Sequence, residues 1–385
     1  MDDVLIVGAG AVGLALAWEL VRHGRKVTVI DRQEAGREAS WAGAGILPAA
    51  RRHAWQHPYE QLRGLAYELH PQWADELRRA TGVDTGYRRC GGVHLAATPG
   101  EAATLAGWAR LMEEEGVAIE RLTAEELAQR EPGVVRPGYH PKLAGYFLPE
   151  EAQLRNPWYL RALAIACRQA GVQIHEHVTV RQWQTRGEQL AGLETSIGTL
   201  CAQRYCLTAG AWTGQLLARL GIATGILPIR GQMVLFRAAV PPIRHILNVG
   251  SRYLVPREDG HVLAGSTEEE AGFDKSTTPE AIAALIDFAR QHVPALSEAT
   301  VQQTWAGLRP GSLDGLPYLG PLPGLVNGFV AAGHFRSGLF LSPATARVMG
   351  QLLRDEPPEV DLSAFDVQRH RRLASAAPSP APPAG

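Results

Sequence analysis

The order of apolar and polar positions predicts a βαβ unit at the start of this chain of 385 residues. Residues 4–7 are apolar and mostly β-branched, which is typical of a buried strand. Apolar residues then recur at helical spacing over 14–23, and a second apolar run follows at 27–30. Two strands joined by a helix predict a parallel sheet that is covered by helices.

The turn between the first strand and the helix reads Gly8-Ala-Gly-Ala-Val-Gly13. In this context a G-x-G-x-x-G turn predicts a dinucleotide site: Gly8 allows the tight turn, Gly10 admits a diphosphate, and Gly13 lets the helix pack on the strand. Unpaired N–H groups at the helix start attract phosphates. Asp31, at the end of the second strand, is placed to accept the hydroxyls of an adenosine ribose. A plain packing turn is the alternative interpretation.

Later patterns predict two interleaved parts. Helical periods occur at 59–80, 101–115, 157–171, 279–292 and 339–353, and strands at 91–96, 172–180, 200–207, 232–237, 253–256, 261–264 and 329–333. The short strands between 226 and 294 indicate an antiparallel sheet in a separate lobe. The helical period lapses over 132–149, which suggests a crossing between lobes, and residues 305–311 look irregular.

The fold class predicted from this pattern is α/β, with a Rossmann-like cofactor domain and an interleaved antiparallel-sheet substrate domain. The cofactor domain is expected to be discontinuous, and part of the C-terminus is too poor in apolar bulk to fold. The predicted division is 1–85, 142–222 and 305–370 for the cofactor domain, 86–141 and 223–304 for the substrate domain, and 371–385 for a disordered tail.

The stretch after Asp31 indicates which dinucleotide binds. Residues 37–48 are mostly small and show no clear period. Small side chains leave room for a flat, bulky group against the backbone, which suits a flavin better than a nicotinamide. FAD is therefore the predicted cofactor, with a flexible loop as the alternative interpretation of this stretch.

The amino-acid composition limits the partners, the cellular location and the metal sites that we expect. The net charge of −1, with 20% charged and 45% hydrophobic residues, gives no reason to expect nucleic acid or an anionic membrane. No apolar run approaches the roughly 20 residues of a membrane-spanning helix, and no basic leader precedes the first strand, so we expect a cytoplasmic protein without membrane insertion. The cysteines form no C-x-x-C pair, so no metal site is expected; they are Cys90, Cys167, Cys201 and Cys206.

Two arginines are the candidate substrate residues. Arg309 and Arg336 occupy glycine-rich, apolar surroundings that we interpret as two converging turns. A guanidinium in such a place is costly unless it is paired, so each either meets a protein carboxylate or awaits the carboxylate of a ligand. Asp314 is the nearby acid that offers Arg309 a structural partner instead.

Two long C-terminal motifs give the chain its family resemblance. Residues 305–311 with 314–320, and 331–338 with 341–345, resemble flavin-dependent glycine oxidases of the D-amino-acid oxidase superfamily, including the thiamine-biosynthesis type. The resemblance extends from the glycine turn to about Phe365. It implies oxidative deamination of glycine, sarcosine and small D-amino acids by hydride transfer to flavin N5. A 2-oxo acid, ammonia or an amine, and hydrogen peroxide would form. It also implies molecular oxygen as co-substrate, a dimer or tetramer, and thiazole-synthesis enzymes as candidate partners.

The resemblance also implies residue roles. Arg336 would hold the substrate carboxylate, Tyr253 would add a hydroxyl, and Arg309 would line the same pocket. Together with the glycine turn, the expected FAD contacts are Gly8, Gly10, Ala11, Val12, Gly13, Asp31, Arg32, Ser40, Gly45, Ile46, Val180, Ala209, Gly210, Gly333, His334, Arg336, Ser337 and Gly338. The flavin is expected to be non-covalent, because no cysteine follows Cys206.

Glu268 departs from the pattern, since the glycine oxidases compared usually carry an apolar residue there. Its side chain either points away from the site or changes the substrate preference. Two alternatives to an oxidase stay open. One is an FAD-dependent D-amino-acid or sarcosine dehydrogenase with a non-oxygen acceptor, and the other is a non-catalytic flavin-binding subunit.

Overall fold

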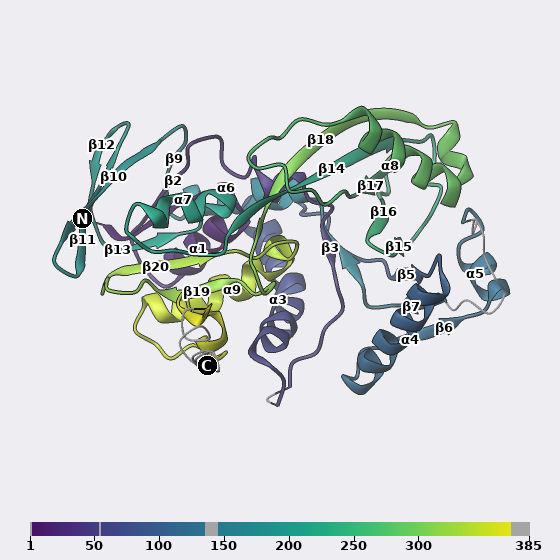
Figure 1. The fold of residues 1–385 in the computed structure, drawn as a ribbon, viewed down its shortest axis with the longest axis horizontal. Helices are drawn as coiled ribbons and strands as arrows, with labels where there is room; N and C mark the ends of the chain where they lie inside the picture. The colour runs from purple at the N-terminus through teal and green to yellow at the C-terminus, as the bar shows by residue number, and fades with distance from the viewer. Residues whose placement is uncertain (1, 54, 135–144, 371–385) are drawn as a thin grey trace, which may run out of the picture.

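The computed structural model describes residues 2–53, 55–134 and 145–370, and it has two lobes (Figure 1). The first lobe is built on a six-stranded sheet of order β19-β20-β13-β1-β2-β9, and the second on an eight-stranded sheet of order β18-β14-β17-β16-β15-β5-β7-β6. The fold is therefore mixed α/β, as the sequence predicts. The tail prediction for 371–385 lies outside the described residues.

The first lobe has the parallel core predicted for the cofactor domain. Its sheet comprises β1 (Asp2–Val7), β2 (Val27–Ile30), β9 (Gln173–His175), β13 (Ala202–Leu207), β20 (Gly328–Ala332) and the antiparallel edge strand β19 (Tyr318–Pro321). One face carries α1 (Ala11–Arg22), α3 (Pro58–Thr81), α6 (Asn156–Gln169) and α9 (Gly338–Leu353). The other face packs against a small antiparallel sheet of β10 (Val180–Arg186), β11 (Gln189–Thr195) and β12 (Gly198–Leu200), with α7 (Thr213–Ala218) beside it.

The strand β1 explains the unbroken apolar run at 4–7. Val4 and Ile6 pack into the helical layer, while Leu5 and Val7 pack toward the small antiparallel sheet. A parallel strand buried on both faces has no solvent side, so its sequence shows no alternation.

The second lobe is mainly antiparallel. Its sheet comprises β5 (Gly92–Leu95), β6 (Glu120–Leu122), β7 (Gly145–Leu148), β14 (Leu227–Arg237), β15 (Ile246–Val249), β16 (Arg252–Pro256), β17 (His261–Gly265) and β18 (Thr300–Gly311). Helix α8 (Pro279–His292) packs its apolar residues on this sheet, and α4 (Pro99–Glu114) and α5 (Ala124–Arg130) lie near its β5–β7–β6 end (Figure 1). A capping box of Thr123 and Glu126 starts α5.

Short elements connect the lobes. A three-stranded sheet of order β3-β8-β4 joins β3 (Ile46–Leu47), β8 (Ala152–Gln153) and β4 (Arg88–Arg89), and the short helix α2 (Ala39–Ala42) precedes it. The 3-10 turns η1 (Gly210–Trp212), η2 (Pro294–Ser297) and η3 (Ser363–Phe365) complete the elements of the described chain. Among the described residues, no helix is long and apolar enough to cross a membrane.

The structure corrects several predicted elements. Residues 305–311 are not irregular but form the end of β18, which pairs with β14 from Thr300 to Gly311. The predicted strand 172–180 stops at His175, because His177 adopts a left-handed backbone with φ 60°. The strands of 180–200 were not predicted. The predicted division placed 145–148 and 305–311 in the cofactor domain, but strand pairing joins both segments to the eight-stranded sheet.

Candidate active site

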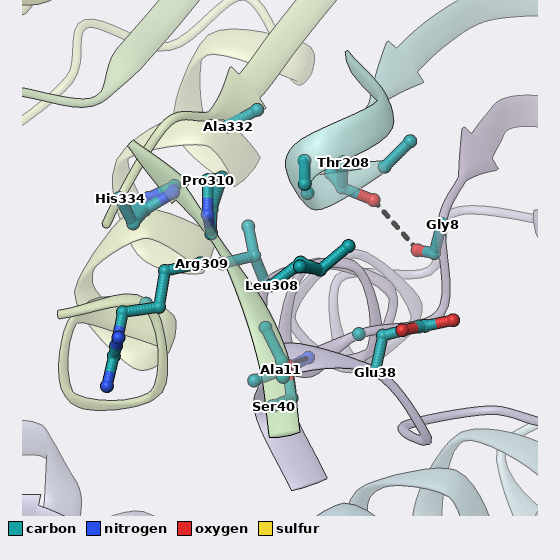
Figure 2. Close-up of a pocket in the computed structure, with 18 of the residues that line it drawn as sticks. Gly8, Ala11, Glu38, Ser40, Thr208, Leu308, Arg309, Pro310, Ala332 and His334 are labelled. Carbon is teal, nitrogen blue, oxygen red and sulfur yellow. Dashed lines mark hydrogen bonds between the residues drawn. The ribbon is translucent and has the colours of Figure 1, made fainter. Parts of the chain in front are cut away.

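A cavity of about 480 Å³ lies between the two lobes, within the size range of small-molecule sites. Its walls come from the β1–α1 turn, the α2 loop, residues 208–219, strands β14, β16 and β18, and the turn before α9. Figure 2 shows Gly8 and Thr208 on one side of this space and Arg309 and His334 on the other. Segments far apart in the sequence therefore share one site.

The glycine turn forms one side of the cavity. Helix α1 begins at Ala11 with Gly10 as its N-cap, and Gly10 has no side chain that could cap the helix. Ser40 Oγ accepts a hydrogen bond from the Ala11 N–H at 2.9 Å. A Cβ on Gly13 would lie 1.9 Å from the Gly8 carbonyl oxygen, so the close packing of helix on strand requires glycine there. Thr208 Oγ1 holds the turn from the opposite side by donating to that carbonyl at 2.8 Å (Figure 2).

Asp31 lies where the sequence predicts, directly after β2 and in the cavity wall. Its carboxylate accepts hydrogen bonds from the N–H groups of Ala9 (2.7 Å) and Gln33 (2.9 Å). Burial raises the pKa of this carboxyl, and the two N–H donors act in the opposite direction. Since two carboxylate oxygens offer about four acceptor positions, the group retains capacity for ribose hydroxyls.

Nearly all predicted cofactor residues line the cavity. They are Gly8, Gly10, Ala11, Val12, Asp31, Arg32, Ser40, Gly45, Ile46, Val180, Ala209, Gly210, His334, Arg336, Ser337 and Gly338. Gly13 and Gly333 do not line it: Gly13 serves helix packing, and a Cβ on Gly333 would press on Tyr318 at 3.0 Å. These two are therefore packing positions in the structure.

Sequence reasoning missed several lining residues. The Arg32 guanidinium lies over the Trp212 ring, 3.6 Å from its centroid, and the available signal was that Trp212 closely follows the strand predicted at 200–207. Asn156, the first residue of α6, donates from its Nδ2 to the Ser40 carbonyl at 2.7 Å. Asn156 thereby ties α6 to the loop that carries Ser40.

Two paired glycines leave the eight-stranded sheet without side chains at one point beside the cavity. Gly231 of β14 stands opposite Gly307 of β18. A Cβ on Gly231 would lie 2.2 Å from Arg309 Nη1, and a Cβ on Gly307 would lie 2.5 Å from the Ala42 Cβ. The missing side chains therefore let the Arg309 guanidinium and the α2 segment approach the strands. No local pattern predicted this pair.

Arg309 lies on strand β18, not in a turn as predicted. Its guanidinium donates to Ser266 Oγ at 2.6 Å and to the Thr267 carbonyl at 3.1 Å. Asp314, the proposed structural partner, instead binds Arg369 at 2.7 Å. Within the described part of the chain Arg309 forms no ion pair, although burial lowers its pKa. A guanidinium stays protonated, so this is a partly buried cation whose hydrogen bonds go to neutral acceptors.

Arg336 and Tyr253 border the same end of the cavity. Arg336 comes from the turn between β20 and α9, donates to the Ser251 carbonyl at 3.2 Å, and lies 3.6 Å from the Glu268 carboxylate. Tyr253 of β16 donates to Met233 Sδ at 3.5 Å. Glu268 pairs with Arg336 but is not among the residues that line the cavity, so both alternatives for its role stay open.

The N-terminus of α9 also borders the cavity. The helix begins at Gly338 with Ser337 as N-cap, and no acid lies in its first turn. Its unpaired N–H groups and partial positive charge favour a negative charge by about 0.3–1 kcal/mol. His334 Nε2 is 3.1 Å from Thr345 Oγ1, and burial lowers the pKa of this histidine to about 3. His334 is consequently neutral near pH 7.

Among the described residues, no group of three or more His, Cys, Asp or Glu side chains could hold a metal ion. A glycine turn at a helix start, an acid after the second strand and a second helix N-terminus in one cavity are the arrangement expected of a flavin-dependent oxidoreductase. A family described as FAD dependent oxidoreductase (DAO) matches residues 3–352, and the chain belongs to this family. Its cofactor is FAD.

Similar proteins of known name indicate which kind of FAD-dependent oxidoreductase this is. A glycine oxidase of Pseudomonas aeruginosa is 35% identical over 361 residues, covering 94% of this chain and 97% of that protein. The crystal structure of glycine oxidase from Geobacillus kaustophilus superposes with a TM-score of 0.91 at 32% identity, over 96% of this chain and 99% of that chain. The bifunctional protein ThiO/ThiG of Trichormus variabilis is 32% identical, over 98% of this chain and 56% of that protein. The chain is an FAD-dependent amino-acid oxidase.

Proposed function

We propose that this enzyme oxidatively deaminates glycine and other small amino acids, including sarcosine and small D-amino acids, with molecular oxygen as the electron acceptor. The observation that carries the proposal is Arg309, a partly buried cation that forms no ion pair within the described chain and shares one cavity with Arg336 and Tyr253. A small carboxylate ligand would supply the missing counter-charge. The similarity to glycine oxidases supports the same substrate class.

The proposed roles of the protein groups are binding and orientation. Arg336 would pair with the substrate carboxylate, and charge-assisted bonds of this kind contribute about 1.5–3 kcal/mol. Tyr253 would donate its hydroxyl to the same group, and Arg309 would neutralise it from the sheet. Fixing the carboxylate in this way orients the α-carbon.

The chemistry itself belongs to the cofactor. Bound FAD supplies the acceptor for the hydride of the α-carbon, and its reoxidation by oxygen gives hydrogen peroxide. The resulting imine hydrolyses to a 2-oxo acid and ammonia or an amine. The N-terminus of α9 would favour the negative charge that reduction adds.

The test is a peroxide assay with glycine, sarcosine, D-alanine and D-proline, in which the 2-oxo acid is measured in parallel. We expect one peroxide for each 2-oxo acid. Turnover that needs a quinone and yields no peroxide would favour the dehydrogenase alternative. If no amine bleaches the flavin, the non-catalytic alternative would replace the proposal.

Three further assignments stay predictions. A cytoplasmic location rests on the sequence pattern, whereas a dimeric or tetrameric state and thiazole-synthesis enzymes as partners rest on the family resemblance. The ThiO/ThiG relatives motivate the last of these, because this chain matches only 56% of the Trichormus variabilis protein. Co-expression with a thiazole synthase and co-purification would test it.

A further inference from the structure

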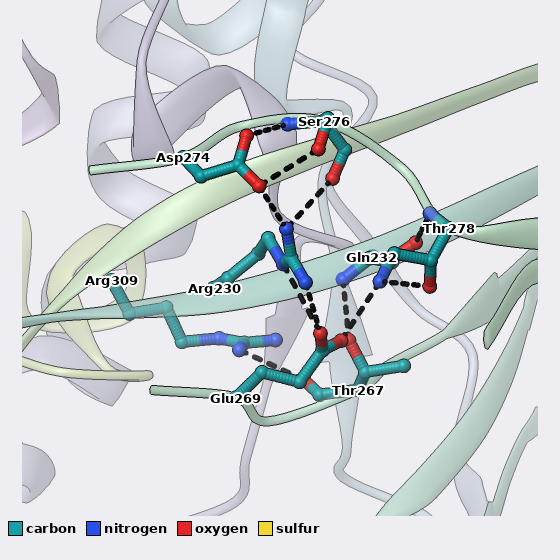
Figure 3. A network of polar contacts seen from close by, with 8 residues as sticks. All are labelled: Arg230, Gln232, Thr267, Glu269, Asp274, Ser276, Thr278 and Arg309. Atoms are coloured by element: carbon teal, nitrogen blue, oxygen red, sulfur yellow. Dashed lines mark hydrogen bonds and ion pairs between the residues drawn. The ribbon is translucent and has the colours of Figure 1, made fainter. Parts of the chain in front are cut away.

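The segment 266–278 contacts the two arginines of the cavity wall and is held by a polar network (Figure 3). The Arg230 side chain, which is 8% exposed, binds Glu269 and Asp274 at 2.6 Å each. The backbones of Arg230 and Glu269 also exchange two hydrogen bonds, of 2.8 and 3.0 Å. Gln232 Nε2 adds a bond to Glu269 at 2.9 Å. The segment therefore has a defined position on β14.

This anchor determines what the neighbouring residues contact. Ser266 and Thr267 accept hydrogen bonds from Arg309, and Glu269 binds Arg230. Glu268 lies between these contacts, with its Oε2 3.6 Å from Arg336 Nη1. Its side chain is about half exposed and is not part of the cavity wall, but it contacts Arg336, which is.

We propose that Glu268 determines substrate specificity by making the site selective for substrates that carry a single negative charge. The inference rests on the proposed function, in which Arg309 and Arg336 bind the substrate carboxylate. The two arginines carry two positive charges, and Glu268 cancels one of them. One substrate carboxylate then neutralises the site, whereas a second would add an uncompensated negative charge.

The neighbouring network does not relieve this repulsion. Its two acids, Glu269 and Asp274, outnumber the single cation Arg230, so it adds no positive charge to the segment. A second ligand carboxylate about 6 Å from the Glu268 carboxylate would be repelled by it. At an effective dielectric constant of about 40, as in a partly exposed site, this repulsion weakens binding about tenfold relative to an uncharged residue at position 268. The site therefore repels ligands that carry two negative charges and attracts ligands that carry one.

The test compares Glu268→Gln with the wild type, both loaded with FAD. The dissociation constants of acetate and malonate, two carboxylates without an oxidisable amine, are measured from the change in the flavin absorption spectrum at pH 8. We expect the ratio of the malonate constant to the acetate constant to fall about tenfold in the variant. The ratio of kcat/KM for D-aspartate to that for D-alanine should rise by a similar factor.

Glu270→Gln is the matched control, since it removes the same charge from an exposed position on the same segment. It should leave both ratios within twofold of the wild type. Glu268→Met removes the same charge with a different side chain and should reproduce the Glu268→Gln result. Agreement between the two variants would show that the effect does not come from misfolding of one of them.

Two results would overturn the inference: unchanged ratios, or equal tightening of acetate and malonate, which would mean that Glu268 only occupies Arg336 in the unliganded protein. The binding ratio requires no turnover. A wild type that oxidises no amine would therefore refute the proposed function and leave the specificity of the anion site measurable.

Discussion

Replacing Gly231 with alanine should move the Arg309 guanidinium without removing its charge. The new Cβ would lie 2.2 Å from Nη1, 2.3 Å from Nη2 and 2.4 Å from Cζ of Arg309. Ordinary contacts between such atoms are about 3.5–4 Å, so the group must move by more than about 1 Å. Because the displaced atoms are the end of a flexible side chain, we expect the fold to persist.

The displacement should break the present contacts of Arg309. Its bonds to Ser266 Oγ (2.6 Å) and the Thr267 carbonyl (3.1 Å) hold the guanidinium in place, and a shift of this size would lengthen both. Loss of one charge-assisted contact costs about 1.5–3 kcal/mol. We therefore expect kcat/KM for glycine to fall about 10- to 150-fold.

The assay combines peroxide-coupled kinetics with FAD content and the melting temperature. The variant should retain FAD and melt within a few degrees of the wild type. Gly107→Ala in α4 is the control, because nothing lies within 4 Å of its added Cβ. Unchanged kinetics in folded, FAD-loaded Gly231→Ala would refute the assignment of Arg309 to the substrate. Loss of FAD would show that the strand moves instead of the side chain.

Three further changes test other parts of the structure. Gly13→Ala should abolish FAD retention on gel filtration, because its Cβ would lie 1.9 Å from the Gly8 carbonyl oxygen; a yellow variant would contradict this. Arg336→Ala should raise the KM for glycine about 10- to 150-fold while FAD stays bound, and an unchanged KM would remove it from the site. Burial lowers the pKa of His70 to about 4, so its neutral form stabilises the fold above pH 6.5 and this contribution falls as the pH drops toward 4. In urea titrations, His70→Gln should lose about 2 kcal/mol less free energy of unfolding than the wild type between pH 7 and pH 5; equal losses would contradict this.

Elements with a strong local signal were predicted well. The helix predicted at 59–80 is α3 (Pro58–Thr81), and the one at 279–292 is α8 (Pro279–His292). Strand β18 was missed because its last half contains two glycines and a proline, residues that favour turns. Its eleven paired positions with β14 override that preference, and such pairing is invisible to a local window.

The sequence alone determined the cofactor end of the site. The glycine turn, the helix after it and Asp31 lie within residues 8–31, and this short stretch specifies their positions on the backbone. The arginine end was decided only by tertiary structure. Arg309, Arg336 and Glu268 come from β18, the β20–α9 turn and the segment anchored by Arg230. Their distances depend on strand pairing and lobe packing, which bring together residues that no periodicity links.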